Sequence, residues 1–236
     1  MPVSLIGIDA DDTLWHNETV FRMTHQRFNE LLGEFAPPED IEATLNQTEQ
    51  RNIAIYGYGA KGFTLSMIET ALEVSGGRVS GTVMREIMNA GKDMMRHPVA
   101  PLPGVEAALS ELAQRGKLIL ITKGDLFHQE SKLAASGLGS RFSGVEIVSE
   151  KTPDIYQRIF QRHGGTPDRA LMAGNSMRSD VLPMLEAGGY AAYVPYPLIW
   201  SHEAADPPGN HPRFRELPAL ADLCIWLDEL QHAGKS

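Results

Sequence analysis

The sequence Val3-Ser4-Leu5-Ile6-Gly7-Ile8 runs directly into Asp9-Ala10-Asp11-Asp12-Thr13-Leu14, and this stretch decides the fold. Its first half is a short apolar run, which is typical of a buried β-strand. Its second half places two carboxylates, Asp9 and Asp11, at the end of that strand, where open α/β sheets bind their ligands. Charge at this density beside a core is costly unless a cation or a reaction needs it. The alternative is an ordinary acidic turn, because Asp is a common turn residue.

Apolar runs of strand length recur along the chain, and helix-like segments lie between them. The runs are Leu5–Ile8, Leu118–Ile121, Val145–Val148, Ala170–Ala173 and Ala191–Val194. The helices predicted between them are Val105–Arg115, Phe127–Ser136, Pro153–His163 and Asp180–Ala187, each followed by a glycine stop signal. This alternation predicts an α/β fold with a Rossmann-like parallel sheet flanked by helices.

Composition limits the classes of partner. The 236 residues are 42% hydrophobic and 22% charged, as in a packed globular protein. A formal net charge of −9 argues against nucleic acid or an anionic membrane, but a metal ion or a lysine could still hold an anionic substrate locally. The single cysteine, Cys224, excludes an internal disulfide. With no signal peptide or membrane-length apolar run in the sequence, we expect a cytoplasmic protein whose oligomeric state is unknown.

Three further motifs follow the first in a recognisable order. An apolar strand ends in a hydroxyl at Leu118-Ile119-Leu120-Ile121-Thr122. A lysine stands at a loop–helix junction in Ser149-Glu150-Lys151-Thr152-Pro153. Finally, Leu171-Met172-Ala173-Gly174 leads into Asn175-Ser176-Met177-Arg178-Ser179-Asp180. Together with Asp9–Leu14, the four motifs resemble those of the haloacid dehalogenase (HAD) superfamily, over residues 3 to about 200.

The resemblance implies a role for each motif residue. Asp9 would be the nucleophile that forms an aspartyl-phosphate, and Asp11 would protonate the leaving oxygen and later activate water. Lys151 would stabilise charge at the phosphoryl group, and Thr122 would donate to a phosphate oxygen. Lys123 is a rival cation that could share this phosphate-binding task. Asp12 replaces the glycine common at its position in the family and is assigned no chemistry beyond a turn.

The same resemblance implies a Mg²⁺ site. Its ligands would be Asp9, the backbone carbonyl of Asp11, Asn175 and Asp180. Asn175 stands where the family has an Asp, so the site loses one charge, and weaker metal affinity is the expected cost. For Asp180 three roles remain open: direct metal ligation, ligation through water, or orientation of Lys151.

The region between the first two motifs has a different texture. Amphipathic helices are predicted over Thr19–Phe35, Glu39–Ile55, Thr64–Ser75 and Ser80–Met95. A helical insertion at this place resembles the cap domain of HAD phosphatases, so the expected domains are a core of residues 1–16 and 101–236 and a cap of residues 17–100. The alternative is a set of helices that pack on the sheet and do not move. The glycine-rich segment Tyr56–Phe63 could carry Tyr58 and Lys61 to the substrate. Glu203, in the pair His202-Glu203, is predicted to lie in a surface loop.

These assignments favour a Mg²⁺-dependent phosphatase that acts on a small phosphorylated metabolite. Asp11 argues against dehalogenases and phosphonatases, because both lack a carboxylate at that position. A phosphosugar mutase would keep Asp9 and Asp11, and a catalytically weak protein that only binds a phosphorylated ligand is a further alternative. Asn175 is the one residue that supports the binding-only hypothesis.

Overall fold

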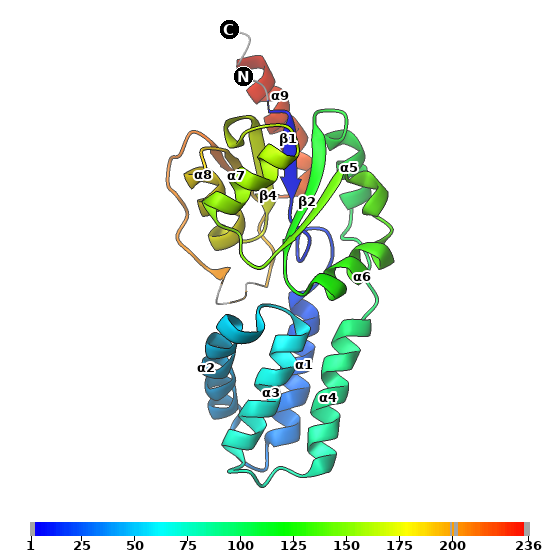
Figure 1. Ribbon diagram of the computed structural model, residues 1–236, viewed down its shortest axis with the longest axis vertical. Helices are drawn as coiled ribbons and strands as arrows, with labels where there is room; N and C mark the ends of the chain where they lie inside the picture. Colours follow the sequence, from blue (N-terminus) through cyan, green and yellow to red (C-terminus); the bar gives the residue numbers. More distant parts are fainter. Residues whose placement is uncertain (1–2, 199, 201–202, 234–236) are drawn as a thin grey trace. The chain divides into compact units, whose positions relative to one another are not determined.

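The computed structural model describes residues 3–198, 200 and 203–233. Within them, strands β1 to β6 form one parallel sheet in the order β3-β2-β1-β4-β5-β6 (Figure 1). The strands are β1 (Leu5–Ile8), β2 (Lys117–Lys123), β3 (Gly144–Val148), β4 (Ala170–Gly174), β5 (Tyr190–Tyr193) and β6 (Phe214–Glu216). The first strand lies between β2 and β4, so the loops that follow all three emerge at one edge of the sheet.

Helices cover both faces of the sheet because alternate residues of each strand point to opposite sides. Ile6 and Ile8 belong to a buried cluster with α5 (Val105–Leu112) and α9 (Leu223–Ala233). Leu5, by contrast, lies in a second cluster with α7 (Pro153–Arg162) and α8 (Leu182–Glu186). The remaining elements after β2 are α6 (Leu126–Ser136) and the short turns η1 (Gly139–Arg141), η2 (Pro167–Arg169), η3 (Met177–Val181) and η5 (Leu220–Asp222). The predicted α/β architecture is confirmed.

The chain divides into two compact units. One comprises the chain up to Glu18, Val99–Lys123 and the chain from Glu130 onward, and it contains the sheet; we call it the sheet unit. The other, the helical unit, comprises Thr19–Pro98 and Gly124–Gln129. The boundary between them falls within α6. None of the described helices is long and apolar enough to cross a membrane.

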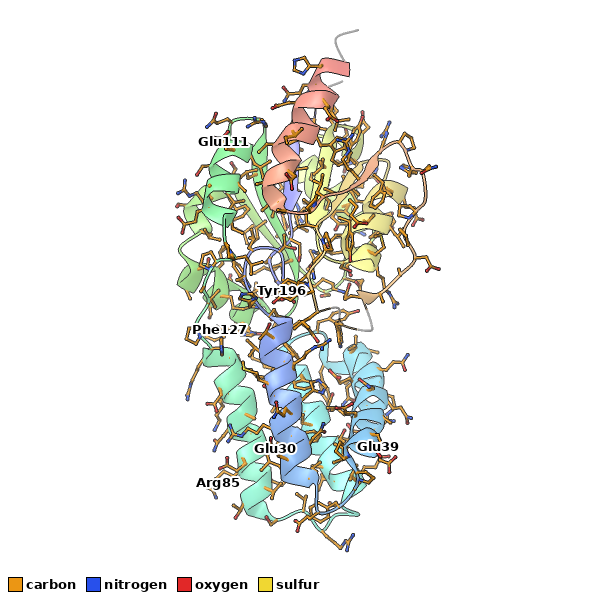
Figure 2. The ribbon with its side chains drawn as sticks, turned by 180° about the vertical axis from the view of Figure 1, so that it is seen from behind. Glu30, Glu39, Arg85, Glu111, Phe127 and Tyr196 are labelled. Atoms are coloured by element: carbon orange, nitrogen blue, oxygen red, sulfur yellow. The ribbon has the colours of Figure 1, made fainter. Side chains whose placement is uncertain are left out.

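The helical unit has its own core. Its helices are α1 (Glu18–Leu32), α2 (Pro38–Tyr56), α3 (Ala60–Val74) and α4 (Gly81–Arg96). Their inward faces bury a cluster that includes Phe28, Leu45, Met67 and Ile87. Charged side chains lie on the outer faces, among them Glu30, Glu39 and Arg85, all exposed (Figure 2). This amphipathic pattern explains why the unit is readable as helices from sequence.

Candidate active site

The loop after β1 is fixed by its own hydrogen bonds. The amide of Leu14 donates to the carbonyl of Ala10 at 2.8 Å, and the amide of Asp12 donates to the carbonyl of Trp15 at 2.8 Å. Asp12 has a φ of 60°, an uncommon backbone conformation for a residue other than glycine. Its carboxylate accepts from the amides of Asn17, at 2.8 Å, and Glu18, at 3.0 Å, so it caps the start of α1. Asp12 is therefore a turn residue, as predicted, with a capping task that the sequence did not reveal.

Asp9, Lys151 and Asp180 form a buried triad. Lys151 Nζ lies 2.5 Å from Asp9 Oδ1 and 2.6 Å from Asp180 Oδ1. Asp180 is fully buried, and its second oxygen accepts from the amide of Ser176 at 2.9 Å. Both oxygens of Asp180 are therefore engaged by protein donors. Of the three roles open to Asp180, this geometry favours orientation of Lys151.

Burial and charge act against each other in the triad. Burial raises the pKa of Asp9 to about 7, Lys151 opposes this shift, and Asp180 adds to it. The pKa of Lys151 is raised, because the attraction of Asp180 and Asp9 outweighs the effect of burial. Two carboxylates around one ammonium would leave an excess negative charge in a buried place. Such a site favours an additional cation.

A short helical turn supplies the fourth motif. The turn η3 is π-helical, since the amide of Val181 donates to the carbonyl of Ser176, five residues back. Such turns are rare and often occur at functional sites. Ser176 also caps the turn, because its Oγ accepts from the amide of Ser179 at 2.9 Å. The result aims Asp180 inward, toward Lys151.

Asn175 lies beside the nucleophile candidate. One terminal atom of its amide is 3.2 Å from Asp9 Oδ2, 3.0 Å from the Asp11 carbonyl oxygen and 3.3 Å from Thr13 Oγ1. With nitrogen at this position, the amide donates to these oxygens. With oxygen there, oxygens of Asp9, Asp11 and Asn175 face one another.

With its oxygen at this position, Asn175 would complete a set of three oxygens that suits a magnesium ion. Mg²⁺ prefers oxygen ligands at 2.0–2.1 Å in an octahedron, which places adjacent ligands about 2.9 Å apart. The separations of 3.0 and 3.2 Å at Asn175 are close to that spacing. Across the described residues, no group of three His, Cys, Asp or Glu side chains could hold a metal. The set at Asn175 is of a different kind, because it includes an amide and a backbone carbonyl.

Thr122 and Lys123 end β2 beside this site. Thr122 is almost completely buried. Lys123 Nζ lies 2.5 Å from Glu203 Oε1, 2.9 Å from Ser179 Oγ and 3.3 Å from Glu150 Oε1. The ammonium predicted to bind phosphate thus contacts two carboxylates in this structure.

Glu203 lies between β5 and β6, in the loop predicted for it, but the prediction that it lies at the surface is wrong. Its side chain is only 16% exposed and accepts hydrogen bonds from Ser176 and Ser179 as well as Lys123. Burial raises the pKa of Glu203, but Lys123 and the serine hydroxyls outweigh burial, so the pKa is lowered overall. His202, the other residue of the pair, lies outside the described residues. Glu203 follows β5 without any local motif, which is why sequence reasoning missed it.

Asp11 has partners that the sequence did not suggest. Lys132 Nζ lies 2.6 Å from Asp11 Oδ1 and 2.7 Å from Asp11 Oδ2. The indole nitrogen of Trp15 donates to Asp11 Oδ1 at 2.7 Å. Lys132 is separated from Asp11 by 121 positions, so only the fold brings the two together.

The predicted substrate loop is shorter than expected. The helix α3 begins at Ala60, so Lys61 lies in its first turn and the loop reduces to Gly57–Gly59. Within the helical unit, Lys61 Nζ lies 2.9 Å from Asp125 Oδ1 and 5.6 Å from the ring centre of Phe127. Tyr58 is half-buried in the same loop. A substrate contact by Tyr58 or Lys61 stays a prediction.

A comparison with protein families decides the identity. The sequence pattern of the haloacid dehalogenase-like hydrolases matches residues 3–188. The chain belongs to this family. The HAD resemblance drawn from the four motifs is therefore confirmed.

Individual HAD relatives differ in how much of the chain they cover. The crystal structure of a haloacid dehalogenase-like family hydrolase from Xanthomonas campestris is similar to this one, with a TM-score of 0.89. The two sequences are 39% identical, and the match covers 99% of this chain and 94% of that one. Human N-acylneuraminate-9-phosphatase is 26% identical over 51% of this chain and 50% of its own length. Pyrimidine 5'-nucleotidase YjjG of Escherichia coli (strain K12) is 28% identical over 50% of this chain and 58% of its own. The matched part thus spans about half the length of these curated relatives.

Proposed function

We propose that this HAD hydrolase is a Mg²⁺-dependent phosphatase that acts on a small phosphate monoester through an aspartyl-phosphate. One observation carries the proposal. Asp9 has one carboxylate oxygen on the buried ammonium of Lys151 and the other beside Asn175 and the Asp11 carbonyl. This arrangement supports a nucleophilic role for Asp9, which would act between a fixed cation and a set of oxygens suited to a second cation.

The reaction divides into two displacements at phosphorus. In the first, a carboxylate oxygen of Asp9 forms a bond to phosphorus while the bond to the ester oxygen breaks. Asp11 gives its proton to that leaving oxygen, which departs as an alcohol. In the second, Asp11 takes a proton from water, whose oxygen bonds to phosphorus as the Asp9–phosphorus bond breaks. Asp9 and the proton on Asp11 are then restored.

Fixed charges would stabilise both displacements. Lys151 would contact the phosphoryl oxygens from its buried position, held there by Asp180. Thr122 would donate its hydroxyl to another oxygen of the phosphoryl group. Asp9, the Asp11 carbonyl and Asn175 would hold Mg²⁺, which supplies charge neutralisation at the phosphoryl oxygens. Lys123 is the candidate for phosphate contact and Asp180 the candidate for metal contact. Because Lys123 already contacts carboxylates and a serine hydroxyl, and Asp180 already contacts a lysine, we propose that both act first by positioning neighbouring side chains.

The helical unit is proposed to act as the cap that the sequence indicates. Closure over a site excludes bulk water and suits a small substrate. Two relatives are named for phosphorylated small molecules, an N-acylneuraminate 9-phosphate and a pyrimidine 5'-nucleotide, which supports this substrate class. Tyr58 and Lys61 are the residues of this unit proposed to meet the substrate.

Release of p-nitrophenol from p-nitrophenyl phosphate tests the proposal. Turnover should require Mg²⁺, stop with EDTA, and fall at least about a thousandfold in Asp9→Asn, because the amide is a poor nucleophile. Lys92→Met, at an exposed position of α4, should retain wild-type turnover. A panel of phosphate esters would then identify the substrate. Wild-type protein that hydrolyses no ester in the presence of Mg²⁺ would contradict the proposal.

A further inference from the structure

The helix α6 buries a polar stripe instead of an apolar one. The buried residues are His128, Gln129, Lys132 and Ser136, each between 4% and 8% exposed. They recur at helical spacing, so they share one side of the helix. Meanwhile Leu126 and Phe127 at the start of α6 are 59% and 65% exposed; Phe127 is labelled in Figure 2. This inverted pattern indicates that the buried side of α6 contacts polar groups of the protein instead of an apolar core.

The charged residue of this stripe, Lys132, forms an ion pair with Asp11. Besides its two contacts with the Asp11 carboxylate, Lys132 Nζ contacts Asn17 Oδ1 at 3.2 Å. An ammonium has three N–H donors, and these three oxygens can satisfy all of them. The Lys132 side chain is 10% exposed and that of Asp11 is 24% exposed, so the lysine is enclosed while the carboxylate keeps access to solvent.

Stability alone gives a weak reason for this arrangement. The desolvation of a buried ion pair offsets much of its attraction, so an apolar pair would often be as stable. Position is a better explanation. A carboxylate on a turn could adopt several rotamers, and Lys132 with Trp15 fixes it from two elements, α6 and the loop after β1.

We propose that Lys132 is a positioning residue that sets the orientation of the Asp11 carboxylate for proton transfer. The proposal rests on the phosphatase function given above. Lys132 need not touch the substrate, because it acts through Asp11. Its removal should impair the protonation of a poor leaving group more than it impairs other steps, since a small displacement of a catalytic group is costly.

The leaving group provides the test. An alkyl phosphate such as glycerol phosphate needs a proton on its leaving oxygen, whereas 2,4-dinitrophenyl phosphate does not. In Lys132→Met, we expect single-turnover cleavage of the alkyl ester to fall about tenfold or more and that of the dinitrophenyl ester to fall less than about threefold. KM should change little, and Lys132→Arg should restore most of the difference. Lys92→Met is the matched control on an exposed lysine.

A double variant separates positioning from a general effect on the fold. In an Asp11→Asn background, adding Lys132→Met should cause no further loss with the alkyl ester, on which Lys132→Met alone has its large effect, because the group that Lys132 positions is gone. Equal losses for both esters, or additive losses in the double variant, would overturn the positioning role and leave the phosphatase proposal intact. A wild-type protein inactive on both esters would overturn both proposals.

Discussion

At the residue scale, the site depends on how closely its backbone segments approach. Gly174 ends β4 beside the triad, and a Cβ added there would lie 2.2 Å from Asp180 Oδ2 and 2.9 Å from Asp9 Cβ. Asp180 cannot move aside without breaking its bonds to Lys151 and the Ser176 amide. Glycine is therefore required at position 174 for a packing reason.

This requirement can be tested by Gly174→Ala. The variant should lower kcat about a hundredfold, because displacement of Asp9 or Lys151 by a fraction of an ångström misaligns the nucleophile. We also expect a loss of about 1–3 kcal/mol in the free energy of unfolding from overpacking. The control is Gly81→Ala in α4, where an added Cβ meets nothing within 4 Å. A folded Gly174→Ala protein with wild-type kcat, measured beside urea unfolding, would contradict the argument.

At the element scale, sequence periodicity gives most of the fold. The apolar runs predicted β1 to β5 within two residues, and the amphipathic segments predicted α1 to α4 within four. β6 was missed because Phe214-Arg215-Glu216 has no apolar run, and its pairing with β5 depends on tertiary context. The predicted helix Asp180–Ala187 is in fact the turn η3 followed by α8, and Pro183 at the start of α8 favours the change.

The candidate site was predictable only as far as local motifs reach. Asp9, Asp11, Thr122, Lys151 and Asp180 all lie at or after the ends of strands that the sequence defines, and the fold brings Asp9, Lys151 and Asp180 into direct contact. Lys132 and Glu203 stand in no motif, and their partners are distant in sequence. The polar spacing on α6 was a readable signal for Lys132, but only the structure shows which side of that helix is buried.

One prediction at this scale concerns α1. Burial lowers the pKa of His25, whose ring packs at 4.9 Å from that of Phe63. As the pH falls, His25 is therefore protonated in the unfolded chain before it is protonated in the folded protein. The free energy of unfolding keeps its full value above the unfolded pKa of about 6.5 and falls as the pH drops below it. Between pH 7.5 and 5.5, the free energy of unfolding should fall less in His25→Gln than in the wild type. This difference is at most about 1.4 kcal/mol per pH unit.

Urea midpoints at the two pH values measure this difference. His232→Gln, at an exposed position of α9, should keep the wild-type acid sensitivity. If His25→Gln and wild type lose stability in parallel, His25 is not buried in its neutral form.

At the scale of the whole molecule, metal binding should be visible as stability of the sheet unit. The two hydrophobic clusters of the sheet and the separate core of the helical unit give the chain its fold without a metal ligand in any of them. Mg²⁺ should therefore act as a ligand of a folded protein and not as a structural staple. Circular dichroism in EDTA should show the native helix and strand content while phosphatase activity is lost.

The size of that stabilisation follows from linkage. Mg²⁺ at ten times its Kd stabilises the folded state by about 1.4 kcal/mol, which raises Tm by about 3–6 °C for a chain of this size. Asn175→Asp adds a carboxylate 3.0–3.2 Å from the oxygens of Asp11 and Asp9, so it should lower Tm in EDTA and enlarge the rise caused by Mg²⁺. Asp9→Asn should reduce that rise. Calorimetry with and without Mg²⁺ separates these effects, and an equal rise in all three proteins would place the ion outside the proposed oxygen set.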